Sequence, residues 1–167
     1  DELLIKLTIF AFMGNLSLGK TFAVLARLFI GAVSKKLEGL DIDRYYIILI
    51  LLDNSKKELT QQKICEALEV DKVMMVKMID YLSLHKYVER RRNPKDRREQ
   101  LIYLTSKARR ILPHIKKAYS SVTKAAFKGM TPDDIRGILH NLNTIHTNLS
   151  ETTSHEIVLS IKREKSK

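Results

Sequence analysis

Apolar positions along most of the chain recur at the three- and four-residue spacing of amphipathic helices. In the N-terminal segment, a first apolar stretch ends at Met13 and is followed by a break at Gly14-Asn15. A helix is predicted from Ser17 to Leu37. Its apolar stripe, which must be buried against another surface, comprises Phe22, Leu25, Ala26, Phe29, Val33 and Leu37.

Three shorter helices are predicted next, each preceded by a residue whose side chain can cap it. The caps and helices are Asp41 for 42–54, Thr60 for 61–69 and Asp71 for 72–85. The first of these is apolar on all sides, so its assignment as a helix rests on its context. The core face of the third holds Met75, Met78, Ile79 and Leu82. Its opposite face then holds Val73, Val76, Lys77 and Asp80.

A basic hairpin is predicted directly after the third short helix. An alternating strand from Val88 to Arg92 reaches a turn that begins at Asn93-Pro94, and a second strand runs from Glu99 to Leu104. The cations of the hairpin are Arg90, Arg91, Arg92, Lys95, Arg97 and Arg98. Two short helices followed by such an arm indicate a helix–turn–helix with a wing.

Two longer helices are predicted to end the chain. The first runs from Thr105 to about Lys128, contains Pro113, which should bend it, and places along one side Ile111, Ile115, Tyr119, Val122 and Ala126. The second begins at Thr131-Pro132-Asp133-Asp134, a strong start signal with a cap, an early proline and two acids. Its apolar residues are Ile135, Ile138, Leu139, Leu142, Ile145 and Leu149.

Composition narrows the class of partner. The 167 residues include 30 Lys and Arg against 19 Asp and Glu, a formal net charge of +11. Such a balance favours a polyanion, either nucleic acid or an anionic membrane surface. The single cysteine excludes an intramolecular disulfide and fits a reducing compartment. Because no apolar run has the length of a membrane span and no signal peptide is evident, a cytoplasmic location is expected.

The stretch from about Leu40 to Pro113 resembles the multiple-antibiotic-resistance regulator (MarR) family. The resemblance is carried by the wing, Asn93-Pro94-Lys95-Asp96-Arg97-Arg98, by Ile102-Tyr103-Leu104-Thr105 after it, and by residues 59–72 before it. It implies a homodimeric transcription regulator, most often a repressor, that binds an inverted-repeat operator in double-stranded DNA. It also implies that a small, often aromatic, ligand releases the DNA.

The resemblance and the helix pattern together give a fold class and four segments. The fold is expected to be mainly α, a winged helix–turn–helix with a two-stranded β wing and N- and C-terminal dimerisation helices. The segments are an N-terminal dimerisation segment (1–40), the DNA-binding lobe (41–105), C-terminal dimerisation helices (106–150) and a polar basic tail (151–167).

The DNA-contacting residues are expected in three groups. The recognition helix contributes Lys72, Val73, Val76 and Lys77, and the wing contributes Arg90, Arg92, Lys95, Asp96, Arg97 and Arg98. Contacts to the DNA backbone are expected from Thr60, Gln61 and Gln62 at a helix N-terminus. By the resemblance, Asp96 should hold the guanidinium of Arg98 for insertion into a narrow minor groove. Apolar Val73 and Val76 stand where the family has small hydroxyl residues, which favours contacts with thymine methyl groups.

The chain departs from the family at two glycine positions. Lys86 stands where the family often has glycine before the first wing strand, and Ala108 stands at a second such position. No metal site or cofactor is expected, because the histidines lack partners at ligand spacing. Cys65 is expected to be a buried, inert thiol.

Two other functions are compatible with parts of the sequence. Residues 14–21 match the phosphate-binding loop of nucleotide hydrolases, and Tyr45–Leu52 followed by Asp53 could be the strand that presents a magnesium ligand. One strand–helix–strand unit would leave a parallel sheet uncovered, so an enzyme is not favoured. The other alternative is a winged-helix protein-interaction module, which the arginine density of the wing speaks against.

Overall fold

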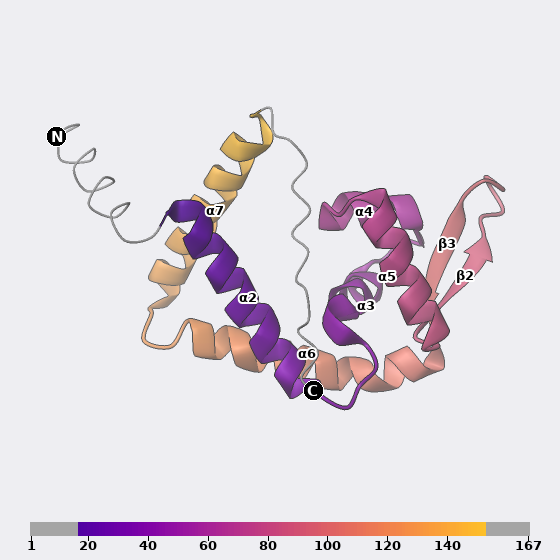
Figure 1. The fold of residues 1–167 in the computed structure, drawn as a ribbon, viewed down its shortest axis with the longest axis horizontal. Coiled ribbons are helices and arrows are strands. Elements are labelled where there is room, and N and C mark those ends of the chain that lie inside the picture. The colour runs from indigo at the N-terminus through magenta and orange to yellow at the C-terminus, as the bar shows by residue number, and fades with distance from the viewer. Residues whose placement is uncertain (1–16, 153–167) are drawn as a thin grey trace, which may run out of the picture. The chain divides into compact units, whose positions relative to one another are not determined.

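The computed structural model describes residues 17–152, which divide into two compact units at Ala126 and Phe127 (Figure 1). Within these residues, the first unit contains five α-helices, two strands of five residues each, and two shorter elements, η1 and β1. In chain order they are α2 (Leu18–Lys36), the 3-10 turn η1 (Asp43–Tyr45), α3 (Tyr46–Asn54), β1 (Leu59–Thr60), α4 (Gln61–Leu68), α5 (Lys72–Leu84), β2 (Val88–Arg92), β3 (Gln100–Leu104) and α6 (Ser106–Ala126). The second unit contains α7 (Pro132–Ser150).

A three-stranded antiparallel sheet joins the wing to the helix–turn–helix. Its strand order is β1-β3-β2, and β2 pairs with β3 from Val88 opposite Leu104 to Arg92 opposite Gln100. The third strand, β1, was not predicted, because two residues are too few to show an alternating pattern. It pairs Leu59 with Ile102 and thereby fixes the wing base beside the start of α4.

The core of the first unit lies under α5. The four residues predicted for its core face are all buried, which confirms that prediction, and Ile64 of α4 is fully buried beside them. Cys65 is buried as predicted, and its thiol donates to the carbonyl of Val70. Because one face of α5 is held in this way, its opposite face is directed outward.

The helices α4 and α5 end on residues that are not glycine but have positive φ: Glu69 at +49° and Lys86 at +60°. At the end of α5, Tyr87 N–H donates to the Leu82 carbonyl at 2.8 Å. Lys86 N–H donates to the Ser83 carbonyl at 3.0 Å. These two bonds form the Schellman helix end, in which glycine is the usual residue. The positive φ thus explains why the related family often has glycine at this position, where this chain places Lys86 in the same left-handed conformation.

The predicted apolar stripes of α2 and α6 are confirmed in part. Of the α2 stripe, Val33 and Leu37 are buried and Phe29 packs partly buried against the core, whereas Leu25 is 59% exposed. α6 packs through Ala108, Leu112, Ile115, Ala118 and Val122. The predicted stripe agreed at Ile115 and Val122 and was wrong at Ala126 and Tyr119, which are exposed. The small alanines allow α6 to approach its neighbours closely.

Aromatic contacts border the interface between α2 and α6. The Tyr119 ring meets the Phe29 ring edge-on, with centroids 5.3 Å apart. Burial of Tyr46, with a smaller contribution from Tyr119, raises the pKa of Tyr46 to about 12. These aromatic residues therefore complete the packing that the alanines of α6 begin.

Two predictions near α3 are corrected. Asp41 does not cap a helix. The 3-10 turn η1 comes before α3, and the residue at the N-cap position of η1 is Ile42, whose side chain makes no capping hydrogen bond. Asp41 instead lies with Oδ2 3.8 Å from Nδ1 of His85. The segment before Asp53 is helical, so the strand required by the hydrolase alternative is absent there. Residues 14–16 of that motif lie outside the described residues, and Ser17 caps α2 by accepting from Lys20 N–H.

The second unit begins as predicted. Thr131 accepts from the Asp134 N–H at 3.2 Å, and the Asp134 carboxylate accepts from the Thr131 N–H at 2.8 Å. This capping box, followed by Pro132, starts α7. No residue of α7 is buried, and Leu139, Leu142 and Leu149 are 54%, 43% and 58% exposed. Among residues 17–152, no helix is both long and apolar enough to cross a bilayer.

Candidate nucleic-acid interface

The outward face of α5 carries the four residues predicted for the recognition helix. Asp71 caps the helix by accepting from the Met74 N–H at 2.8 Å. Val73 and Val76 are 66% and 42% exposed, and the lysines beside them, Lys72 and Lys77, are also exposed. Exposed valines on a packed helix present methyl groups to a partner, and the lysines present charge to the same side.

The wing tip is a structured turn. Asn93 N–H donates to the Glu99 carbonyl at 3.1 Å, and the Asn93 amide donates to the Glu99 carboxylate at 2.8 Å. The Asn93 side-chain oxygen accepts from the Lys95 N–H at 3.0 Å. Side-chain oxygens that accept from the backbone two residues on are typical of Asx turns. The tip therefore has a defined shape although its cations are exposed.

The predicted contact between Asp96 and the Arg98 guanidinium is not the one formed. The Asp96 carboxylate accepts from the backbone N–H of Arg98 at 2.9 Å. Asp96 therefore shapes the turn and leaves the guanidinium of Arg98 to other contacts. Besides Arg91, four wing cations are exposed: Arg92, Lys95, Arg97 and Arg98.

The remaining two arginines of the wing have partners. Arg90 donates from Nη2 to Oδ1 of Asp80 on α5 at 2.5 Å. Arg91 pairs with Glu89 on the same strand, and its guanidinium carbon lies 4.6 Å from the centre of the Tyr103 ring. Arg90 therefore links the wing to α5, whereas Arg91 is held within the wing.

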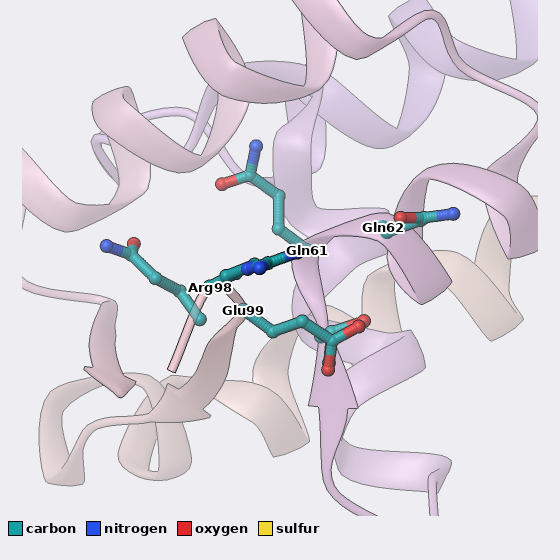
Figure 2. Close-up of a pocket in the computed structure, with 6 residues that line it drawn as sticks. Gln61, Gln62, Arg98 and Glu99 are labelled. Atoms are coloured by element: carbon teal, nitrogen blue, oxygen red, sulfur yellow. The ribbon is translucent and has the colours of Figure 1, made fainter. Parts of the chain in front are cut away.

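A cleft of about 300 Å³ lies between the start of α4 and the start of β3 (Figure 2). It is lined by Thr60, Gln61, Gln62, Arg98, Glu99 and Gln100. Figure 2 shows the Arg98 side chain extending from the wing toward the first turn of α4, where Gln61 lies. Two groups that the sequence suggested separately, the helix N-terminus and the wing arginine, therefore line the same cleft. The Thr60 hydroxyl accepts from Lys63 N–H at 3.2 Å, so it serves as the cap of α4.

The sequence did not predict a hydrogen bond that connects the wing to the segment before β1. The Tyr103 hydroxyl on β3 donates to the Glu58 carboxylate, just before β1. This hydrogen bond is the largest cause of a raised pKa at Tyr103. The alternation of β3 places Tyr103 on the face opposite Ile102, but the partner lies 45 residues away along the chain. No local pattern could have identified Glu58.

Comparison with known proteins settles the family. A family model described as the transcriptional regulator SarA/Rot matches residues 29–115, more than half of the chain. The chain belongs to the SarA/Rot family of transcriptional regulators. The matched residues include most of the first unit, from the middle of α2 to the middle of α6. No curated protein matches the chain.

Solved structures confirm the fold class and the expected MarR resemblance of this SarA/Rot protein. A MarR transcriptional regulator from Methanosarcina mazei Go1 is 27% identical, with a TM-score of 0.71, over 80% of this chain and 96% of that one. A MarR-family regulator from Rhodococcus sp. RHA1 is 25% identical, with a TM-score of 0.65, over 76% and 90%.

A third neighbour shows the fold alone. A putative MarR-family regulator from Listeria monocytogenes, solved with a 26mer DNA, is 18% identical, with a TM-score of 0.73, over 81% of this chain and 90% of that one. Together these structures confirm a mainly helical winged helix–turn–helix for this protein.

Proposed function

We propose that this SarA/Rot protein is a homodimeric DNA-binding repressor that recognises an inverted-repeat operator. The observation that carries the proposal is the ion pair between Asp80 and Arg90. It joins the outward side of α5 to the first wing strand, so the helix and the wing belong to one continuous face. An exposed helix beside a basic arm fits a major groove and the adjacent minor groove.

The three groups of residues have different roles in this proposal. Val73 and Val76 of α5 contact thymine methyl groups, and Lys72 and Lys77 contact base edges or phosphates. The exposed wing cations hold the backbone, with Arg98 closest to the minor groove. Gln61 and Gln62, at the start of α4, meet a phosphate on the side of the cleft opposite the wing. The neighbour from Listeria monocytogenes, which was solved with a 26mer DNA, supports DNA as the partner.

Dimerisation is proposed from the exposed apolar side chains outside the core. They are Leu18, Leu25 and Leu28 of α2 and Leu139, Leu142 and Leu149 of α7. Apolar side chains at helical spacing that a single chain leaves exposed mark an association surface. Repression by competition with polymerase, and release by a small aromatic ligand, rest on the family resemblance alone.

Selection of bound DNA from a random pool tests the function. The expected product is an inverted repeat with half-sites about 34–36 Å apart, one helical turn of DNA. Its binding constant should fall steeply with salt, with a log–log slope of about −0.9 for each phosphate contacted. Selection of no sequence would contradict the proposal. If the chain instead binds another protein with an affinity that does not depend on salt, the second candidate, the protein-interaction module, is favoured.

Two wing arginines test the assigned roles. Arg98→Ala should weaken operator binding about tenfold, because it removes a groove contact. Arg91→Ala should cost about threefold or less, because Arg91 is already paired within the wing. Fluorescence anisotropy with the selected operator measures both. Equal, small losses would contradict the minor-groove assignment of Arg98.

A further inference from the structure

Asp80 is an acid in a place where the proposed function would disfavour one. It lies on the outward side of α5, its side chain is 58% exposed, and the wing cation Arg90 is its ion-pair partner. A carboxylate on a surface that faces phosphates repels them and lowers affinity. Its presence there calls for a role that offsets this repulsion.

The partner of Asp80 is the least exposed wing arginine. The Arg90 side chain is 26% exposed, compared with 62% for Arg91. Its Nη2 lies 2.5 Å from Oδ1 of Asp80, a short charge-assisted hydrogen bond between helix and strand. Of the ion pairs among the described residues, this one joins the two proposed groove readers, α5 and the hairpin of β2 and β3, drawn side by side in Figure 1.

We infer that Asp80 is a positioning residue for DNA recognition, which acts on DNA through Arg90. A guanidinium has five N–H donors in a rigid planar fork. Nη2 of Arg90 donates to Asp80, and we assign the donors on the other side of the guanidinium to a phosphate. Asp80 thereby fixes the phosphate-binding orientation of Arg90 and the spacing between the recognition helix and the wing. The inference rests on the proposed DNA-binding function and adds a residue that none of its three contact groups contains.

The direction in which Asp80→Asn changes operator affinity distinguishes this positioning role from a purely electrostatic effect. Asp80→Asn removes a negative charge near DNA, so charge alone predicts tighter binding to every duplex. If Asp80 positions Arg90, operator binding should instead weaken about tenfold, because an interaction between paired groups is lost. Binding to an unrelated duplex of the same length should stay level or tighten slightly. The ratio of operator to unrelated binding should therefore fall.

The matched control removes the same charge from the wing itself. Glu89→Gln breaks the pair with Arg91 on the same strand and leaves the contact with α5 intact. Its binding to both duplexes should stay level or tighten by no more than about threefold. Thermal unfolding midpoints of both variants should match the original chain, since exposed ion pairs contribute little to stability.

Two further variants test whether the residues act together. Arg90→Lys keeps the charge but loses the fork, so it should lower the operator ratio as Asp80→Asn does. A double variant, Asp80→Asn with Arg90→Lys, should bind no more weakly than either single one, because both break the same link.

The outcomes distinguish failure of this inference from failure of the proposed function. If the unmodified chain binds no operator, the proposed function fails and this inference falls with it. If the unmodified chain binds but Asp80→Asn tightens operator binding as Glu89→Gln does, only the inference is overturned. Losses that multiply in the double variant would also overturn it, since Arg90 and Asp80 would then act independently.

Discussion

The winged-helix lobe and α7 bury their apolar residues in different ways. In the lobe, α5 directs its apolar side inward, and Ile79 and Leu82 are fully buried within the same chain. In α7 the apolar residues repeat just as regularly, yet none of the residues of the helix is buried. The lobe therefore buries its apolar side within a single chain, whereas the apolar side of α7 is left exposed and is assigned to the proposed dimer.

This difference predicts which substitutions should affect the stability of the fold and which should affect dimer assembly. Substitutions inside the lobe should change the free energy of unfolding, because the buried surface is intramolecular. Substitutions on the apolar side of α7 should change the dimer dissociation constant and leave the lobe folded. Four substitutions, ordered from the largest expected effect to the smallest, test how the lobe and α7 differ.

Ile79→Ala should destabilise the lobe by about 2–5 kcal/mol, the usual cost of a buried large-to-small change. Ile79 is fully buried on α5. Val73→Ala is the control. Val73 lies on the same helix but is 66% exposed, so the substitution should change the free energy of unfolding by less than about 0.5 kcal/mol. Urea unfolding measures both. Similar losses for the two variants would show that α5 has no preferred inward face.

Leu142→Asp should weaken the proposed dimer about a hundredfold, because it places a charge in the apolar surface that this dimer would bury. Sedimentation measures the dissociation constant, and far-ultraviolet circular dichroism should show the helices intact. Thr144→Asp introduces the same charge on the opposite side of α7 and should leave the dimer unchanged. A Leu142→Asp protein that remains dimeric would mean that α7 is not part of the interface.

Lys86→Gly should stabilise the lobe by about 1 kcal/mol, since φ at this position is +60° and glycine adopts positive φ without steric cost. The gain should appear as a higher urea midpoint. Lys72→Gly, at the start of the same helix, should not be stabilising, because Lys72 has ordinary helical geometry. A loss of stability at position 86 would mean that the Lys86 side chain contributes more than its backbone strain costs.

The cap of α7 should respond weakly to acid. Hydrogen bonds from the Thr131 side chain, and then from its backbone, lower the pKa of Asp134 below 3.8. Because the folded pKa is the lower one, this stabilisation is present above the unfolded pKa and is lost as pH falls through the folded value. Asp134→Ala should therefore reduce helicity at pH 7 but make little difference near pH 2. An equal loss at both values would contradict a charged cap.

Much of the lobe could be predicted because its signals are local. Thr60 and Asp71 cap α4 and α5 as expected, and the spacing of Met75 to Leu82 identified the buried side of α5 correctly. The wing strands also follow from alternation and the Asn93-Pro94 turn.

The error on α6 arises because helix packing depends on neighbours that are distant along the chain. On α6 the predicted stripe favoured large residues such as Tyr119, whereas the helix packs through Ala108 and Ala118. Small side chains give a weak apolar signal even when they permit the closest contact. The error at Asp96 has a local cause instead, because its carboxylate accepts from the Arg98 N–H two residues on, as in an Asx turn, and not from the guanidinium.

For the candidate site, the sequence correctly placed the recognition-helix residues on an exposed side, but it did not show that Thr60 is only 3% exposed or which residues are paired. Lys72, Val73, Val76 and Lys77 all lie on the outward side of α5. The pairing of Arg90 with an acid on a different element appears only in three dimensions.

Hydroxyl-radical footprinting of the unmodified chain on its selected operator tests the central claim most directly. Two lobes joined through helices outside their cores should protect two half-sites whose centres lie about 34–36 Å apart. Leu142→Asp, at concentrations where it is monomeric, should protect both sites only weakly, because each lobe then binds alone. A single protected site, or full protection by the monomeric variant, would contradict the account.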